Sequence, residues 1–253
     1  MLESYLRNRL KKKDILLMTH LVLGYPSMED SFRIIETMVE AGVDLMELQI
    51  PFSEPVADGP VILHANQMAL ERGATVKQAF ELAEKVAKNF DIPFLIMTYY
   101  NILFKYGLPR FVSEMAKKGI KGSIVPDLPP EEGEEYFNAM EEHSLSSILI
   151  FSPTTTLNRM QYLAGFAGGF VYCVARKGVT GSFTDFSEEL AGYLSMCRNT
   201  TNLPIALGFG VKEKKDVDFL TQKADIAVIG TQTIKVIEKD GIDAAGDFIR
   251  SLR

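Results

Sequence analysis

Three carboxylates lie close together in the stretch ELQIPFSEPVADGP, which runs from Glu47 to Pro60. Glu47 stands near the end of an apolar run, and Glu54 and Asp58 follow in a proline-punctuated loop. A glutamate surrounded by apolar residues has a raised pKa and can act as a general acid or base near neutral pH. A second carboxylate in the loop that follows could share the proton transfers. The stretch therefore predicts acid–base chemistry, with Glu47 and Asp58 as the candidate pair.

A repeated pattern along the chain indicates what positions these acids. Short apolar, β-branched runs alternate with amphipathic stretches, as in parallel βα units. We expect strands at residues 15–24, 44–51, 93–100, 122–127, 146–153, 169–175, 204–210 and 225–231. The expected helices span residues 28–42, 75–90, 108–119, 131–144, 156–166, 187–199, 214–223 and 244–252, after a basic helix at 2–14.

Eight such units in about 250 residues predict a closed (β/α)8 TIM barrel. An open doubly wound sheet is the alternative, but it would usually carry a glycine-rich fingerprint after its first strand, and none occurs here. No linker or change of composition divides the chain, so we expect a single barrel domain over residues 1–253.

Composition excludes several classes of protein. The formal net charge of −6 disfavours partners that are polyanions, so we expect neither nucleic acid nor an anionic membrane as a partner. No apolar run approaches the roughly 18 residues of a membrane span. The two cysteines, Cys173 and Cys197, suggest a reducing compartment without a disulfide framework, and we expect a cytoplasmic protein.

The strand period places the acids more closely. If residues 44–51 form the second strand, then Leu45, Glu47 and Gln49 share one face, and an inward face would put Glu47 at the carboxyl rim of the barrel. The alternative is a surface glutamate on an irregular strand end. Asp58 on its own would read as part of a simple turn, and it becomes a candidate partner because its loop directly follows Glu47.

Glycine-rich segments after the last three expected strands indicate an anion site. Gly208 and Gly210 end the seventh strand, Gly230 and Thr231 would open a short helix after the eighth, and residues 176–183 follow the sixth. Any one of these glycines could simply make a tight turn. Together, at adjacent strand ends and with a helix N-terminus among them, they favour a phosphorylated small molecule as ligand.

The run ELQIPFSEPVADGPVI closely resembles the signature of the tryptophan synthase alpha subunit family. The likeness extends to MTYYN (97–101), PDLPPEE (126–132), RKGVTG (176–181), LGFG (207–210) and IGT (229–231), in the order typical of the family. The resemblance implies a lyase of tryptophan biosynthesis that cleaves indole-3-glycerol phosphate, in an aldol-type reaction, into indole and glyceraldehyde 3-phosphate. It also implies that this chain carries no cofactor and no metal.

The resemblance assigns roles to individual residues. Glu47 matches the acid–base group, and Asp58 matches the aspartate that contacts the indole N–H. Tyr172 matches a tyrosine near the substrate, although a packed barrel tyrosine is an equal alternative. Gly181, Gly210, Gly230 and Thr231 match residues that bind the phosphate, and residues 176–183 match a closing loop. Thr180 in that loop matches the threonine that meets Asp58 when the loop closes.

A partner is implied as well. Alpha subunits of this family join a beta subunit that contains pyridoxal phosphate, in an alpha-beta-beta-alpha heterotetramer. They pass indole to it and exchange allosteric signals with it. The loop over residues 51–60 would then face both the active site and the beta subunit.

Three departures from the family pattern keep a second function open. Gln49 stands where the family usually has glycine, Tyr25 and Glu54 replace aspartates, and Gln49 and Tyr25 add bulk. If Gln49 filled the indole site, the chain would be a catalytically impaired subunit that mainly activates the beta subunit. A different phosphate-binding barrel enzyme, such as an isomerase, would share only the phosphate loops. His20 is expected to be a satisfied core histidine, because the three histidines are scattered.

Overall fold

Parallel strands close into a barrel in the computed structural model of the chain, which describes residues 1–175, 188–208 and 210–253. Neighbouring strands pair in chain order, and β8 pairs with β1. The strands are β1 (Leu16–Val22), β2 (Leu45–Gln49), β3 (Phe94–Met97), β4 (Gly122–Ile124), β5 (Ser146–Phe151), β6 (Val171–Val174), β7 (Ile205–Gly208) and β8 (Ile226–Ile229). The predicted TIM barrel is confirmed.

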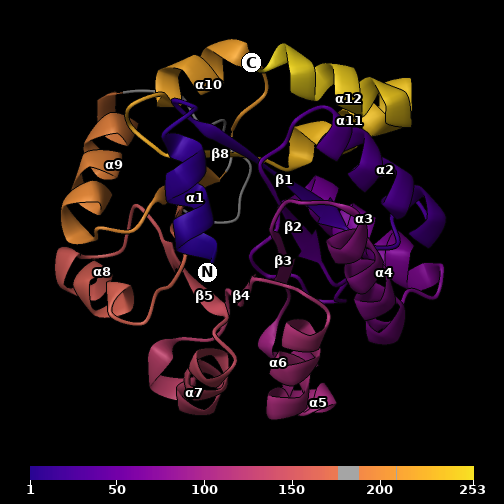
Figure 1. Ribbon diagram of the computed structural model, residues 1–253, viewed down its shortest axis with the longest axis horizontal. Coiled ribbons are helices and arrows are strands. Elements are labelled where there is room, and N and C mark those ends of the chain that lie inside the picture. Colours follow the sequence, from indigo (N-terminus) through magenta and orange to yellow (C-terminus); the bar gives the residue numbers. More distant parts are fainter. Residues whose placement is uncertain (176–187, 209) are drawn as a thin grey trace.

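Helices surround the strands, as Figure 1 shows. They are α1 (Leu2–Leu10), α2 (Met28–Glu40), α3 (Pro60–Glu71), α4 (Val76–Asn89), α5 (Tyr100–Tyr106), α6 (Leu108–Lys117), the 3₁₀ turn η1 (Pro130–Glu132), α7 (Glu134–Glu142), α8 (Leu157–Ala164), α9 (Glu188–Thr200), α10 (Lys214–Leu220), α11 (Thr231–Asp240) and α12 (Ile242–Ser251). Within the described ranges, none of these helices has the length and apolar character needed to cross a membrane.

Two helices were not predicted. In α3, Gly59 is the N-cap and Pro60 occupies the first turn, where proline needs no hydrogen bond from its nitrogen. In α5, the N–H of Tyr100 donates to the carboxylate of Asp127, with a distance of 2.9 Å to Oδ1. That partner lies 27 residues away in the sequence, so no local pattern reveals it. The expected strand at 93–100 therefore ends early, at Met97.

Three hydrophobic clusters occur among the described residues, and the two larger ones form the cores of the barrel. One fills the space between the strands and the outer helices, and the other lies inside the barrel. The inner core includes Leu16 and Leu45 from the strands and Leu2 and Leu6 from α1. Helix α1 therefore covers the amino end of the barrel, where Figure 1 shows it lying across the strands. The carboxyl end is left for the site.

The inward face of β2 carries the first candidate acid. Leu45 packs in the inner core, and side chains alternate along a strand, so Glu47 and Gln49 also face inward. The register sets His20 of β1 beside Glu47 and Val22 beside Gln49. The predicted orientation of Glu47 and Gln49 is confirmed.

Candidate active site

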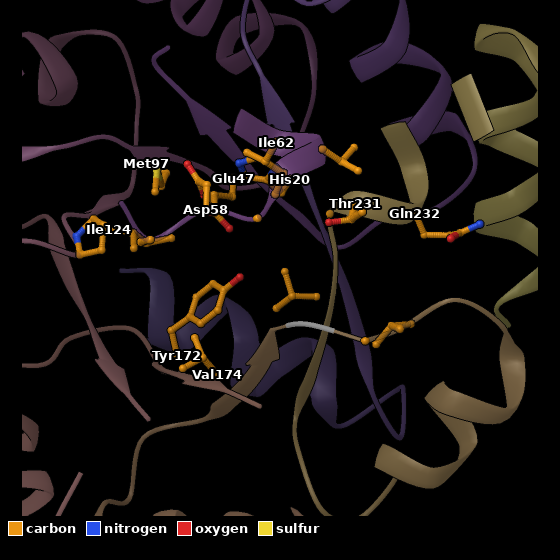
Figure 2. Close-up of a pocket in the computed structure, with 18 of the residues that line it drawn as sticks. His20, Glu47, Asp58, Ile62, Met97, Ile124, Tyr172, Val174, Thr231 and Gln232 are labelled. Carbon is orange, nitrogen blue, oxygen red and sulfur yellow. The ribbon is translucent and has the colours of Figure 1, made fainter. Parts of the chain in front are cut away.

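A cavity of about 320 Å³ opens at the carboxyl ends of the strands (Figure 2). This volume lies at the lower end of the range for small-molecule sites. Every predicted site residue within the described ranges lines it: Glu47, Asp58, Tyr172, Gly210, Gly230 and Thr231. The other two predicted residues, Thr180 and Gly181, lie outside the described residues, as does the proposed closing loop at 176–183.

Glu47 is a buried acid with spare hydrogen-bonding capacity. Its side chain projects from β2 into the cavity and is only 4% exposed. Burial, and secondarily the nearby charge of Asp58, raise the pKa of Glu47 to about 8, although a hydrogen bond with Tyr172 opposes the rise. Its Oε2 atom has no hydrogen-bond partner among the described residues. Glu47 therefore holds a proton near neutral pH and has an oxygen available to a ligand.

Two hydrogen bonds hold one oxygen of the Asp58 carboxylate. Its Oδ2 atom accepts hydrogen bonds from Nε2 of Gln49 at 2.7 Å and from the hydroxyl of Tyr99 at 3.0 Å. Burial raises the pKa of Asp58, while the hydrogen bonds from Gln49 and Tyr99 oppose that rise. The loop that carries Asp58 is anchored too, because the N–H of Ala57 donates to the Tyr99 hydroxyl at 3.1 Å.

Gln49 and Tyr25 do not occupy the cavity, although their bulk raised the alternative of a blocked indole site. Neither side chain is among the described residues that line it. Gln49 is fully buried beneath the wall, where its amide contacts Asp58 and His20 instead of Glu47. Tyr25 extends away to α11, where its hydroxyl donates to Glu238 at 2.5 Å. The departures at these two positions therefore leave the cavity open.

His20 is more than a satisfied core residue, and this interpretation of the sequence was incomplete. Its Nε2 atom lies 2.7 Å from Oε1 of Gln49, but its Nδ1 atom is buried without a partner among the described residues. His20 lines the cavity between Glu47 and Gly230. The period of β1 could have revealed it, because His20 shares the inward face with Leu16 and Met18.

The start of α11 forms the other end of the cavity. Gly230 is the N-cap, Thr231 is the first helical residue, and the N–H groups of a first helical turn have no partners within the helix. Gly210 faces them and has a φ of 103°, which favours glycine. Lys212 and Lys235 also line the cavity and were not predicted. Lys235 follows Thr231 by four residues, a spacing that places both on one helix face. This end suits an anion.

Gly208 does not line the cavity, although its segment was predicted to form part of an anion site. A Cβ atom at this position would lie 2.3 Å from Cε1 of Tyr172 and 2.6 Å from its hydroxyl oxygen. The Tyr172 ring therefore lies directly over the Gly208 backbone, and Figure 2 shows it facing Asp58 and Glu47 across the cavity. The missing side chain of Gly208 makes room for Tyr172.

In the described ranges, no group of three or more His, Cys, Asp and Glu side chains is arranged to hold a metal ion. The arrangement places a buried glutamate with a raised pKa, a held carboxylate and a helix start that suits an anion around one cavity.

Comparisons with known proteins agree with this arrangement. The family model described as tryptophan synthase alpha chain matches residues 6–250. The chain is 64% identical over 252 residues to the tryptophan synthase alpha chain of Desulforapulum autotrophicum and 61% identical over 253 residues to that of Syntrophotalea carbinolica, with 100% of each chain covered. A solved structure of a protein from Aquifex aeolicus superposes with a TM-score of 0.91 at 35% identity, covering 99% of this chain and 96% of that one. A Mycobacterium tuberculosis tryptophan synthase structure gives 0.92 at 27% identity, with the same coverage.

Proposed function

This chain belongs to the tryptophan synthase alpha chain family and is a lyase that cleaves indole-3-glycerol phosphate, and we propose that Glu47 and Asp58 carry out that cleavage. The observation that supports the proposal most directly is the state of Glu47. It is a buried acid with a pKa raised to about 8, and one of its oxygens has no hydrogen-bond partner among the described residues. Such a group can both give and take a proton.

The reaction breaks the bond between C3 of the indole ring and the adjacent glycerol carbon. In our proposal, the Glu47 carboxyl donates its proton to C3, and the electron pair of the breaking bond remains with the indole. The Glu47 carboxylate then takes the proton of the hydroxyl on the departing carbon, which becomes the aldehyde of glyceraldehyde 3-phosphate. One group thus serves both transfers and returns to its starting state.

Asp58 has an electrostatic role in this proposal. Protonation of C3 places positive charge on the indole ring, and a carboxylate that accepts a hydrogen bond from the ring N–H stabilises this charge. Asp58 lies in the loop after β2 and lines the same cavity as Glu47. Because Gln49 and Tyr99 already hold Oδ2, the carboxylate does not have to reorganise when the charge develops.

The phosphate would bind at the start of α11. We assign to it the backbone N–H groups at Gly230 and Thr231, the Gly210 segment, and the cations Lys212 and Lys235 at the cavity wall. Gly181 remains a predicted contact of the phosphate and Thr180 a predicted contact of Asp58, since both residues lie outside the described residues. Tyr172 would border the indole ring, opposite Asp58.

Membership of this family implies a beta-subunit partner. We propose an alpha-beta-beta-alpha assembly in which the beta subunit contains pyridoxal phosphate and receives the indole. The loop after β2 supports this placement, because Val56 is 63% exposed while Asp58, two residues later, lines the cavity. Phe104 of α5 is another exposed apolar side chain, at 67%. Binding at this loop would give the partner direct influence over Asp58.

We expect Asp58→Asn to lower kcat for indole release from indole-3-glycerol phosphate by about 10²-fold, since an amide cannot balance the charge on the ring. Indole release by the purified chain, with and without its beta subunit, provides the measurement. Asp218→Asn on the exposed face of α10 is the matched control and should leave kcat unchanged. A full rate in Asp58→Asn would contradict the role assigned to Asp58.

Gly208→Ala should lower kcat/KM for the same reaction by about tenfold. The added methyl group must displace the Tyr172 ring, which then loses its place beside Glu47, and a tenfold change in rate corresponds to only about 1.4 kcal/mol. Gly192→Ala in α9 is the control, because a Cβ there meets nothing within 4 Å. Equal activities of the two variants would show that the position of Tyr172 does not matter for cleavage.

A further inference from the structure

A chain of three buried polar side chains runs beneath the cavity wall. His20 lies 2.7 Å from Gln49 through Nε2 and Oε1, and Gln49 lies 2.7 Å from Asp58 through Nε2 and Oδ2. His20 is 5% exposed and Gln49 is fully buried. Buried polar groups cost free energy unless they are paired, so this chain of hydrogen bonds needs an explanation.

The chemistry of the three groups fixes the direction of the hydrogen bonds. An ionised Asp58 can only accept, so the amide nitrogen of Gln49 must face it. The amide oxygen of Gln49 then faces His20 and also accepts, so Nε2 of His20 must carry the hydrogen. Burial lowers the pKa of His20, against the opposing effects of Asp58 and Gln49, and so favours the neutral ring. The hydrogen bond to the Gln49 oxygen then places the hydrogen of that ring on Nε2. Donation runs from His20 to Gln49 to Asp58.

This direction has a consequence for Asp58. Gln49 and Tyr99 both donate to Oδ2, so within the described residues Oδ1 is the oxygen that remains to accept from the substrate. Each donated hydrogen bond also favours the ionised carboxylate, against the effect of burial. Aligned hydrogen bonds polarise one another, so a neutral histidine at the far end strengthens the bond that Gln49 makes to Asp58.

The backbone makes the arrangement rigid. Gln49 follows Glu47 by two residues on the inward face of β2, and His20 pairs with Glu47 in the register of β1 and β2. Asp58 itself lies in a loop, which would be less well ordered by itself. Gln49 thus ties the loop acid to the strand that carries the other acid, as a support for a precise site requires.

We propose that Gln49 and His20 are positioning residues for the cleavage, which hold Asp58 in the orientation and ionised form that stabilise the charge on indole. The proposal rests on the role proposed above for Asp58. It assigns Gln49 the opposite effect from steric obstruction: its removal should slow the reaction.

The test uses Gln49→Met, which keeps the side-chain volume but lacks the amide, in the wild-type chain and in Asp58→Asn. We expect kcat/KM for indole release to fall about tenfold in the wild-type background, the size of one hydrogen bond to a charged group, and less than about twofold in Asp58→Asn. Gln161→Ala on the exposed face of α8 is the control. Thermal unfolding of each variant, assayed below its midpoint, separates loss of activity from loss of folding.

A second pair of variants tests the far end of the chain of bonds. His20→Phe removes the donor to Gln49 and should lower kcat/KM by about threefold to tenfold, whereas His20→Gln can donate from its own amide and should stay within about twofold of the wild type. A purely structural role for the ring would predict no advantage of glutamine over phenylalanine.

Three results would overturn the proposal. Gln49→Met at full or higher activity would show that the glutamine is a bystander or an obstruction. An equal loss in the wild-type and Asp58→Asn backgrounds would show an effect that does not act through Asp58. Full activity of Asp58→Asn would contradict the role proposed for Asp58, and the inference that Gln49 and His20 position Asp58 would then be wrong as well. A loss in Asp58→Asn without one in Gln49→Met rejects only the inference.

Discussion

Glu47→Gln is expected to lower kcat for indole release by about 10²- to 10⁴-fold and to leave KM nearly unchanged. The amide keeps the shape of the side chain but can neither donate an acidic proton to C3 nor take one from the glycerol hydroxyl. Single-turnover assays with the purified chain measure the loss directly. Glu71→Gln, at the exposed end of α3, is the matched control and should retain the wild-type kcat.

The pH dependence of kcat/KM gives an independent measurement of the same role. In our proposal the protonated form of Glu47 begins the reaction, and burial raises the pKa of Glu47 to about 8, so activity should decline as the pH rises through that value. The proposal also needs Asp58 to be ionised, and the charge of Asp58 contributes to the raised pKa of Glu47, so the profile depends on both acids. A decline above pH 8 that persists unchanged in the residual activity of Glu47→Gln would contradict the assignment.

The same substitution should stabilise the fold. Because the pKa of Glu47 is higher in the folded chain than its ordinary value of 4.5, the folded state binds more protons than the unfolded state between these values. Stability attributable to Glu47 is therefore present at low pH and is lost as the pH rises through about 8. Glu47→Gln removes this loss, so at pH 9 the variant should unfold at a higher temperature than the wild type. Loss of activity with gain of stability is typical of a functional buried acid.

The predictable parts of the fold were those that depend on local periodicity. Alternation along β2 placed Leu45, Glu47 and Gln49 on one face, and the eight repeated units identified the barrel. Strand ends were less accurate, because a strand ends where its hydrogen-bonding neighbours end. The fourth strand was expected at 122–127 but stops at Ile124, where its pairing with β3 and β5 stops.

The site was predictable in its acids but not in its supports. Glu47 and Asp58 could be identified because they lie in one short segment. The contacts of Gln49 could not, since they depend on His20 from β1 and on the conformation of a loop. Lys212 and Lys235 lacked a sequence signal strong enough to separate them from ordinary surface lysines. The positions of these side chains depend on contacts between residues far apart in the sequence, which no single segment predicts.

The largest expected effect on stability lies at the other end of β2. The side chain of Asp44, just before the strand, is fully buried and within 2.7 Å of three cations: Arg9, Lys13 and Arg253. Its Oδ2 atom also accepts from the N–H of Leu17 at 3.0 Å. Burial alone would raise the pKa of Asp44, but these hydrogen bonds together lower it below its ordinary value. One carboxylate thus joins both chain ends to the barrel.

Asp44→Asn should therefore lower the free energy of unfolding by about 3–5 kcal/mol, because it leaves three cations close together without their counterion. Urea denaturation at pH 7 measures the loss, and Glu3→Gln, which breaks an exposed pair with Arg7, should cost less than about 1 kcal/mol. Since the folded pKa of Asp44 is lowered, the contribution of this carboxylate to the free energy of unfolding is present above pH 4 and disappears as the pH falls through the folded pKa. The wild type and Asp44→Asn should therefore have similar free energies of unfolding in acid.

The folded variant should still cleave its substrate at the wild-type kcat, because the amino end of a TIM barrel serves stability and the carboxyl end serves chemistry. A loss of kcat in fully folded Asp44→Asn would show that the two ends of β2 are not independent.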